Sequence, residues 1–76
     1  MFNRDTEGGN VRVTVNGKET NLEREMSIAE FLRFKGIVEA LVAVEYNLNW
    51  VRREEWPNIT LKEDDRVEVI QIMAGG

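Results

Sequence analysis

The side chains most often used in catalysis are missing from this chain, because its 76 residues include no cysteine and no histidine. The chain therefore has no thiolate nucleophile, no disulfide, no thiolate or imidazole metal ligand and no imidazole base near neutral pH. Its one serine, Ser27, has no such base to activate the hydroxyl group. A Ser-Lys or carboxylate pair remains possible, but no spacing in the sequence singles one out. The composition predicts that the protein is not an enzyme by itself and binds no metal.

The most distinctive feature of the sequence is its end, where a strand-like stretch is followed by Gly75 and Gly76. The apolar, β-branched stretch from Arg66 to Met73 predicts a strand, which the polar residues Lys62 to Asp65 precede as a turn. Ala74, Gly75 and Gly76 follow this strand. Glycine has no Cβ, so Gly75 and Gly76 let another protein approach the main chain closely. We expect a flexible, accessible carboxyl terminus.

Composition and charge limit the other functions. A chain with 42% hydrophobic and 32% charged residues is typical of one small globular domain. The net charge of −4 and the scattered basic residues argue against binding to nucleic acid. The longest apolar run, Ala40 to Val44, is too short to span a membrane, and the polar leader Met1 to Asn10 does not have the pattern of a secretory signal. We expect a cytoplasmic protein with a flexible leader over residues 1–10.

The domain begins with a predicted hairpin. Val11, Val13 and Val15 alternate with polar residues, as in a strand with one buried face. Asn16-Gly17 is typical of a two-residue turn, because both residues accept positive φ angles. Lys18 to Leu22 then forms the antiparallel partner strand.

A short helix is predicted over about residues 28–35. Ser27 and Glu30 have the spacing of a capping box, in which each side chain accepts a hydrogen bond from the backbone of the other residue. Met26 and Phe31 are spaced as a hydrophobic staple, and Gly36 is placed to end the helix. We interpret Ser27 as a structural cap.

The second half of the chain predicts an inner strand at Leu41 to Tyr46, a turn at Asn47 to Asn49 and an irregular segment. We expect Trp50 and Trp56 in that segment to cover one end of the core. A sheet with one helix on a single face accounts for these patterns, so the fold class is α+β: a β-grasp domain over residues 11–76, with a mixed sheet of four to five strands.

Successive side chains of the last predicted strand point to opposite faces of the sheet. Val67 and Val69 would face the helix, whereas Ile70 and Ile72 would face outward. Two exposed isoleucines beside the terminus, followed by Met73 and Ala74, form a candidate surface for binding partner proteins.

Three stretches of the sequence resemble the ThiS-type sulfur carriers of the ubiquitin-like β-grasp superfamily. They are Val11 to Leu22; Val42 to Glu45 followed by Asn47, Val51, Arg53 and Trp56; and Asp65 to Gly76. Arg52 stands where that family usually has proline, and Asp64 where it often has glycine.

The resemblance implies that other proteins modify Gly76. An ionised carboxylate is a poor electrophile and must be activated. In the family an adenylating enzyme, ThiF-like, uses ATP to activate the terminal glycine, and sulfur from a persulfide donor then gives a thiocarboxylate. A ThiG-like thiazole synthase receives this sulfur in thiamin biosynthesis. The resemblance implies no bound cofactor, and the partner uses the ATP.

Three other functions remain open from the sequence. A MoaD-like sulfur carrier of molybdopterin synthase would share the fold, although prolines usually precede its tail and Gln71 to Ala74 contains none. A ubiquitin-like modifier would join Gly76 to lysine residues of other proteins. A plain interaction module would have an idle tail.

Overall fold

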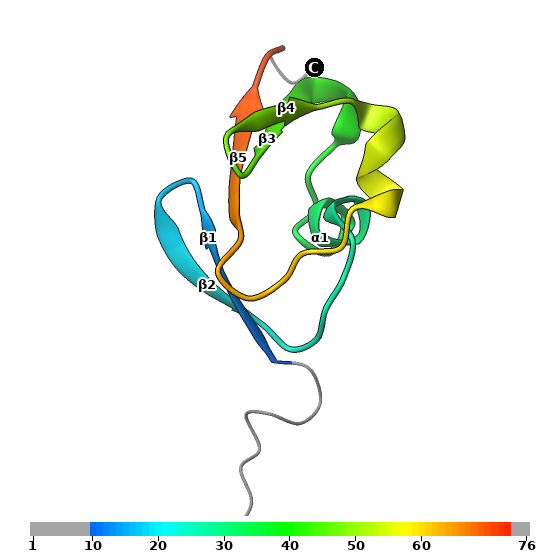
Figure 1. The fold of residues 1–76 in the computed structure, drawn as a ribbon. Helices are drawn as coiled ribbons and strands as arrows, with labels where there is room; N and C mark the ends of the chain where they lie inside the picture. Colours follow the sequence, from blue (N-terminus) through cyan, green and yellow to red (C-terminus); the bar gives the residue numbers. More distant parts are fainter. Residues whose placement is uncertain (1–9, 74–76) are drawn as a thin grey trace, which may run out of the picture.

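The computed structural model describes residues 10–73, in which five strands form one sheet in the order β2-β1-β5-β3-β4 (Figure 1). β1 pairs with β5 in parallel, and the other neighbouring strands are antiparallel. The elements are β1 (Val11–Val15), β2 (Lys18–Leu22), α1 (Ile28–Phe34), η2 (Glu39–Leu41), β3 (Val42–Tyr46), β4 (Asn49–Val51), η3 (Arg53–Asn58) and β5 (Arg66–Gln71). The mixed sheet and its helix confirm the predicted α+β, β-grasp fold. The predicted leader, apart from Asn10, lies outside the described residues.

The hairpin of β1 and β2 has the predicted boundaries and register. Val15 pairs with Lys18, and Val11 pairs with Leu22. Asn16 and Gly17 both have positive φ, 51° and 82°. This backbone twist matches that of the flanking strands, so a two-residue turn joins them without a bulge.

The predicted capping box sets the start of α1. The Glu30 N–H donates to the Ser27 Oγ atom at 3.0 Å, and the Ser27 N–H donates to the Glu30 Oε1 atom at 2.9 Å. Lys35 caps the other end, and Gly36 follows with a φ of 75°. Together these contacts satisfy backbone groups that a short helix leaves without intrahelical partners.

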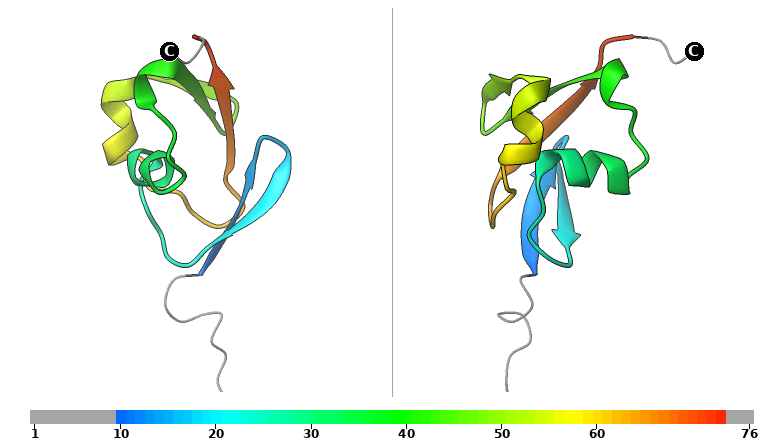
Figure 2. Two further views of the ribbon diagram at one scale, coloured as in Figure 1. Left: turned by 180° about the vertical axis from the view of Figure 1, so that it is seen from behind. Right: turned by 90° about the vertical axis from the view of Figure 1, so that its right-hand side faces the viewer.

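The core lies between α1 and one face of the sheet, and η3 lies on the same side (Figure 2). Val13, Val44 and Val67, from three neighbouring strands, are almost completely buried. Phe31 and Leu32 meet them from α1, and other buried residues complete the cluster. Burial of these apolar side chains is the main stabilising contribution in a domain of this size. No helix within residues 10–73 is long and apolar enough to cross a membrane.

The two tryptophans lie in different environments. Trp56, in η3, is 2% exposed, and its Nε1–H donates to the Val51 carbonyl at 3.2 Å. Trp50 is 61% exposed, so the prediction that it covers the core is wrong. The cause is the register of β4: Asn49 belongs to the strand, and Trp50 pairs with Glu45 on the sheet face that α1 does not cover.

Candidate functional site

The candidate site is the end of β5 on the outer face of the sheet, opposite α1. Val67 is buried and Val69 packs against the core, whereas Ile70 and Ile72 are 40% and 59% exposed. This alternation confirms the predicted orientation of the strand. Met73 is 56% exposed beyond the strand. Their role in partner binding stays a prediction.

The main chain is held in place up to Met73. The N–H groups of Ile72 and Met73 donate to the Leu41 carbonyl at 2.8 and 3.4 Å. The Gln71 Nε2 group donates to the Met73 carbonyl at 2.9 Å. Ala74, Gly75 and Gly76, the predicted tail and sulfur attachment site, lie outside the described residues. The hydrogen bonds therefore fix the position from which that tail leaves the sheet.

The neighbours of Ile70 on the outer face follow from the register. Ala43 of β3 pairs with Ile70, and its small side chain leaves the isoleucine exposed. In the next outward-facing row, Glu45 lies between Trp50 of β4 and Glu68 of β5. The outer face near the end of β5 thus combines apolar side chains with carboxylates. Sequence reasoning missed Trp50 as a member of this face.

A hydrogen-bond network around Asp65 fixes the start of β5. Its Oδ2 atom accepts from the Tyr46 hydroxyl at 2.7 Å and from the Lys62 N–H at 2.8 Å, and its Oδ1 atom accepts from the Asn47 side chain at 3.1 Å. Burial alone would raise the pKa of Asp65, but these hydrogen bonds outweigh it and hold that pKa below its ordinary value. Burial and the bond to Asp65 raise the pKa of Tyr46 to about 12.

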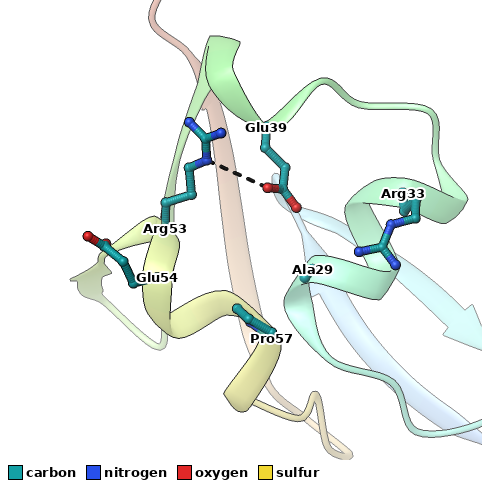
Figure 3. A pocket seen from close by; sticks show the side chains of 6 residues that line it. All are labelled: Ala29, Arg33, Glu39, Arg53, Glu54 and Pro57. Carbon is teal, nitrogen blue, oxygen red and sulfur yellow. Dashed lines mark ion pairs between the residues drawn. The ribbon is translucent and has the colours of Figure 1, made fainter.

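A concave region between α1 and η3 lies apart from these residues (Figure 3). Ala29 and Pro57 form its apolar part, and Arg53 Nε lies 3.6 Å from Glu39 Oε1 at its edge. Arg33 and Glu54 also line it. None of the residues predicted for the site lines this region.

The sequence is similar to a known family and to known proteins. The model of the ThiS family matches residues 7–76. Two proteins named thiazole synthase, from Paramagnetospirillum magneticum and Magnetococcus marinus, are 27% and 32% identical to the chain over 66 residues, or 87% of its length. The chain spans only about 20% of the length of these two relatives.

The fold is similar to that of solved structures. The crystal structure of a thiamine biosynthesis protein (ThiS) from Geobacter metallireducens is similar, with a TM-score of 0.75 and 32% sequence identity. The similarity covers 87% of this chain and 100% of that one. An NMR structure of a thiamine biosynthesis protein from the same organism gives a TM-score of 0.72 and covers 88% of that chain.

Proposed function

The chain belongs to the ThiS family, and from this membership we propose that it is a sulfur carrier of thiamin biosynthesis whose Gly76 is the site of sulfur attachment. The observation that carries the proposal is the extent of the family match, which reaches Gly75 and Gly76. The hydrogen bonds just before these residues support it, because the Leu41 carbonyl and the Gln71 side chain hold Ile72 and Met73 directly after the end of β5.

The proposed chemistry takes place at the Gly76 carboxyl group. A carboxylate oxygen attacks the α-phosphorus of ATP, and pyrophosphate leaves, so that an acyl adenylate forms. The terminal sulfur of a persulfide attacks the carbonyl carbon, and AMP leaves. A partner thiol then cleaves the sulfur–sulfur bond, forms a disulfide with the donor and leaves a thiocarboxylate on Gly76. Because the chain has no cysteine or histidine, its partners supply every thiol and imidazole base, and we propose that the chain itself is not an enzyme.

We propose that the adenylating enzyme docks on the outer face near the end of β5. Ile70, Ile72 and Met73 expose apolar area directly before the tail. Trp50 adds a large apolar side chain on the same face. Aromatic side chains often contribute much of the binding energy at protein interfaces. Glu45 and Glu68, between Trp50 and Ile70, favour a partner surface with basic residues around an apolar centre.

A thiazole synthase is the proposed acceptor of the sulfur. The two relatives of that name contain a segment similar to most of this chain. This supports a functional connection between a domain of this type and thiazole formation. The acceptor would bind the same face after the adenylating enzyme has left.

The decisive experiment is sulfur loading with purified components. The chain is incubated with the adenylating enzyme of its own organism, ATP and a persulfide donor, and its intact mass is then measured. We expect a mass increase equal to the replacement of one oxygen atom by sulfur, located at Gly76 by fragmentation. The loaded chain should then support thiazole formation by the thiazole synthase of that organism.

Deletion of Gly76 is the matched control. The shortened chain keeps every described residue and should give the same circular dichroism spectrum without gaining sulfur. If the shortened chain is still loaded, Gly76 is not the attachment site. If the full chain is joined to lysine residues of other proteins instead, the chain is a protein modifier.

A further inference from the structure

The last strand has an open edge that the sheet itself does not use. β1 and β5 pair only at Thr14 with Arg66 and at Val15 with Val67, because β1 ends there and turns into β2. β5 continues to Gln71 (Figure 1). Within residues 10–73, no strand pairs with the β1 side of β5 beyond Val67.

The hydrogen-bonding direction along β5 can be assigned from its contacts. Arg66 accepts from the Asn47 N–H, and Ile72 donates to Leu41, so the even-numbered residues direct their backbone polar groups toward β3. The odd-numbered residues point the other way: Val67 accepts from the Asn16 N–H.

The next odd-numbered residues continue this pattern. The Val69 N–H also points toward the hairpin and donates to the Asn16 side chain. By the two-residue period of a strand, the Val69 carbonyl and both backbone groups of Gln71 also face this open side.

A groove lies directly beside this edge, on the helix side of the sheet. Its apolar lining comes from β1, α1, the segment after α1, β3 and β5. These lining residues are Val15, Phe31, Ile37, Val42 and Val69. All except Phe31 are only partly buried. The groove therefore offers apolar contacts to every second side chain of a strand added to β5.

The rim of the groove carries a positive charge. The exposed side chain of Lys35 lines it, and no carboxylate within residues 10–73 lies within ion-pair distance of Lys35. In a chain with a net charge of −4, an unpaired lysine at an apolar groove favours a segment with a carboxylate at the matching position.

We propose that an extended segment of the enzyme that acts on the tail adds to β5 at Val69 and Gln71. Its backbone pairs with the open edge, its alternate apolar side chains enter the groove, and an acidic residue meets Lys35. This inference rests on the proposed function, and it assigns a second contact surface on the face of the sheet opposite Ile70 and Ile72.

The location gives this contact a role in positioning the tail. The Gln71 side chain is also the group that holds the Met73 carbonyl. A segment paired with Gln71 would lie about 4.8 Å from β5, the normal spacing between strands. Strand addition would therefore stiffen the residues from which the tail leaves and align the tail with the active site of the same enzyme.

Amide hydrogen exchange tests this inference at single residues. The chain is labelled with nitrogen-15, and exchange is measured by NMR with and without the unlabelled adenylating enzyme. We expect the Gln71 amide to exchange rapidly in the free chain and at least about tenfold more slowly in the complex, as for a backbone group that gains a hydrogen bond. The Ile70 amide, which faces β3, is the internal control and should be protected in both states.

The matched variants are Gln71→Pro and Gln71→Ala. Both remove the side-chain bond to Met73, but only proline removes the N–H and adds bulk at the open edge. Because this N–H does not point toward β3, the proline variant should keep the fold. We expect it to bind the adenylating enzyme about tenfold more weakly than Gln71→Ala. Lys35→Glu should also weaken binding, whereas Arg24→Glu, which makes the same charge change away from the groove, should not.

The results of these experiments distinguish failure of strand addition from failure of the proposed function. Equal binding by the proline and alanine variants overturns strand addition. An unchanged exchange rate of the Gln71 amide in a complex that still loads sulfur also overturns it. In both cases the proposed function still stands. Gln71 protection that grows with the concentration of the free chain means that a second copy occupies the edge, and this also overturns the inference. If the enzyme neither binds nor loads the wild-type chain, the proposed function fails and the inference fails with it.

Discussion

The Val69 N–H donates a hydrogen bond of 2.7 Å to the Oδ1 atom of Asn16, which lies 53 positions earlier in the chain. Asn16 thus has two functions: its backbone adopts the positive φ of the turn, and its side chain extends the contact between the hairpin and β5 beyond the last residue pair. This contact lies between the part of β5 that pairs with β1, Arg66 and Val67, and the part whose edge on that side is open.

Replacing Asn16 tests the contribution of this contact. Asn16→Gly keeps the positive φ but removes the acceptor, so we expect a loss of about 1 kcal/mol in the free energy of unfolding, measured with urea. Asn16→Asp keeps an acceptor oxygen at the same place and should lose less. A glycine variant as stable as the wild type would show that the bond contributes nothing.

The capping box gives a second prediction. Ser27→Ala removes the Oγ acceptor of the Glu30 N–H, and the free energy of unfolding should fall by about 0.5 to 2 kcal/mol. Sulfur loading at a temperature where the variant is folded should remain at the wild-type level. A folded variant without carrier activity would mean that the hydroxyl group has a functional role.

The two faces of β5 give opposite expectations for lysine substitutions. Val67→Lys places a charge in the core, where Val67 has no exposed area, and should unfold the domain. Ile70→Lys lies on the outer face and should leave the melting temperature nearly unchanged while weakening the complex with the adenylating enzyme. Circular dichroism and calorimetric titration measure the two effects. The reverse order of stabilities would contradict the assigned orientation of the strand.

The Asp65 network predicts how stability depends on pH. The folded state holds the pKa of Asp65 below its ordinary value of 3.8. Its stabilising contribution is therefore present at neutral pH and is lost as pH falls from the unfolded pKa through the folded one. The pKa of Tyr46 is raised from 10.0 to about 12. Its contribution is present below pH 10.0 and is lost as pH rises toward 12.

Tyr46→Phe separates these two effects. Without the hydroxyl group the alkaline loss assigned to Tyr46 should disappear, and the pKa of Asp65 should move upward because one of its hydrogen bonds is missing. Thermal unfolding across acidic, neutral and alkaline buffers, with NMR titration of the Asp65 carboxyl carbon, measures both. An Asp65 titration identical in the two proteins would contradict the network.

Much of the fold could be predicted because local signals agreed with the global arrangement. Asn16-Gly17 fixed the register of the first hairpin, and the Ser27 and Glu30 pair fixed the start of α1. The outward orientation of Ile70 followed from one reference residue, Val67, because a strand has a period of two.

The environment of Trp50 could not be predicted, because the same two-residue period places a side chain on the opposite face when the register shifts by one residue. β4 has three residues, too few to show an alternating pattern. Its register depends on the turn at Asn47 and Leu48, which has two residues with φ of 48° and 74°. A leucine at positive φ is uncommon and gives no hairpin signal. A turn one residue longer would point Trp50 toward the core. The open edge of β5 could not be predicted from the sequence either, because it depends on where β1 ends relative to β5.

The strand order has a consequence for how this protein is made. β5 lies between β1 and β3, yet it is the last of the five strands to be synthesised. A nascent chain on the ribosome has both halves of the sheet before it has the strand that joins them, and the contacts that link the two halves through β5 form only after β5 has been made. Completion of the fold and emergence of the residues that lead to the tail are therefore the same event, so a prematurely terminated chain would present neither to the activating enzyme.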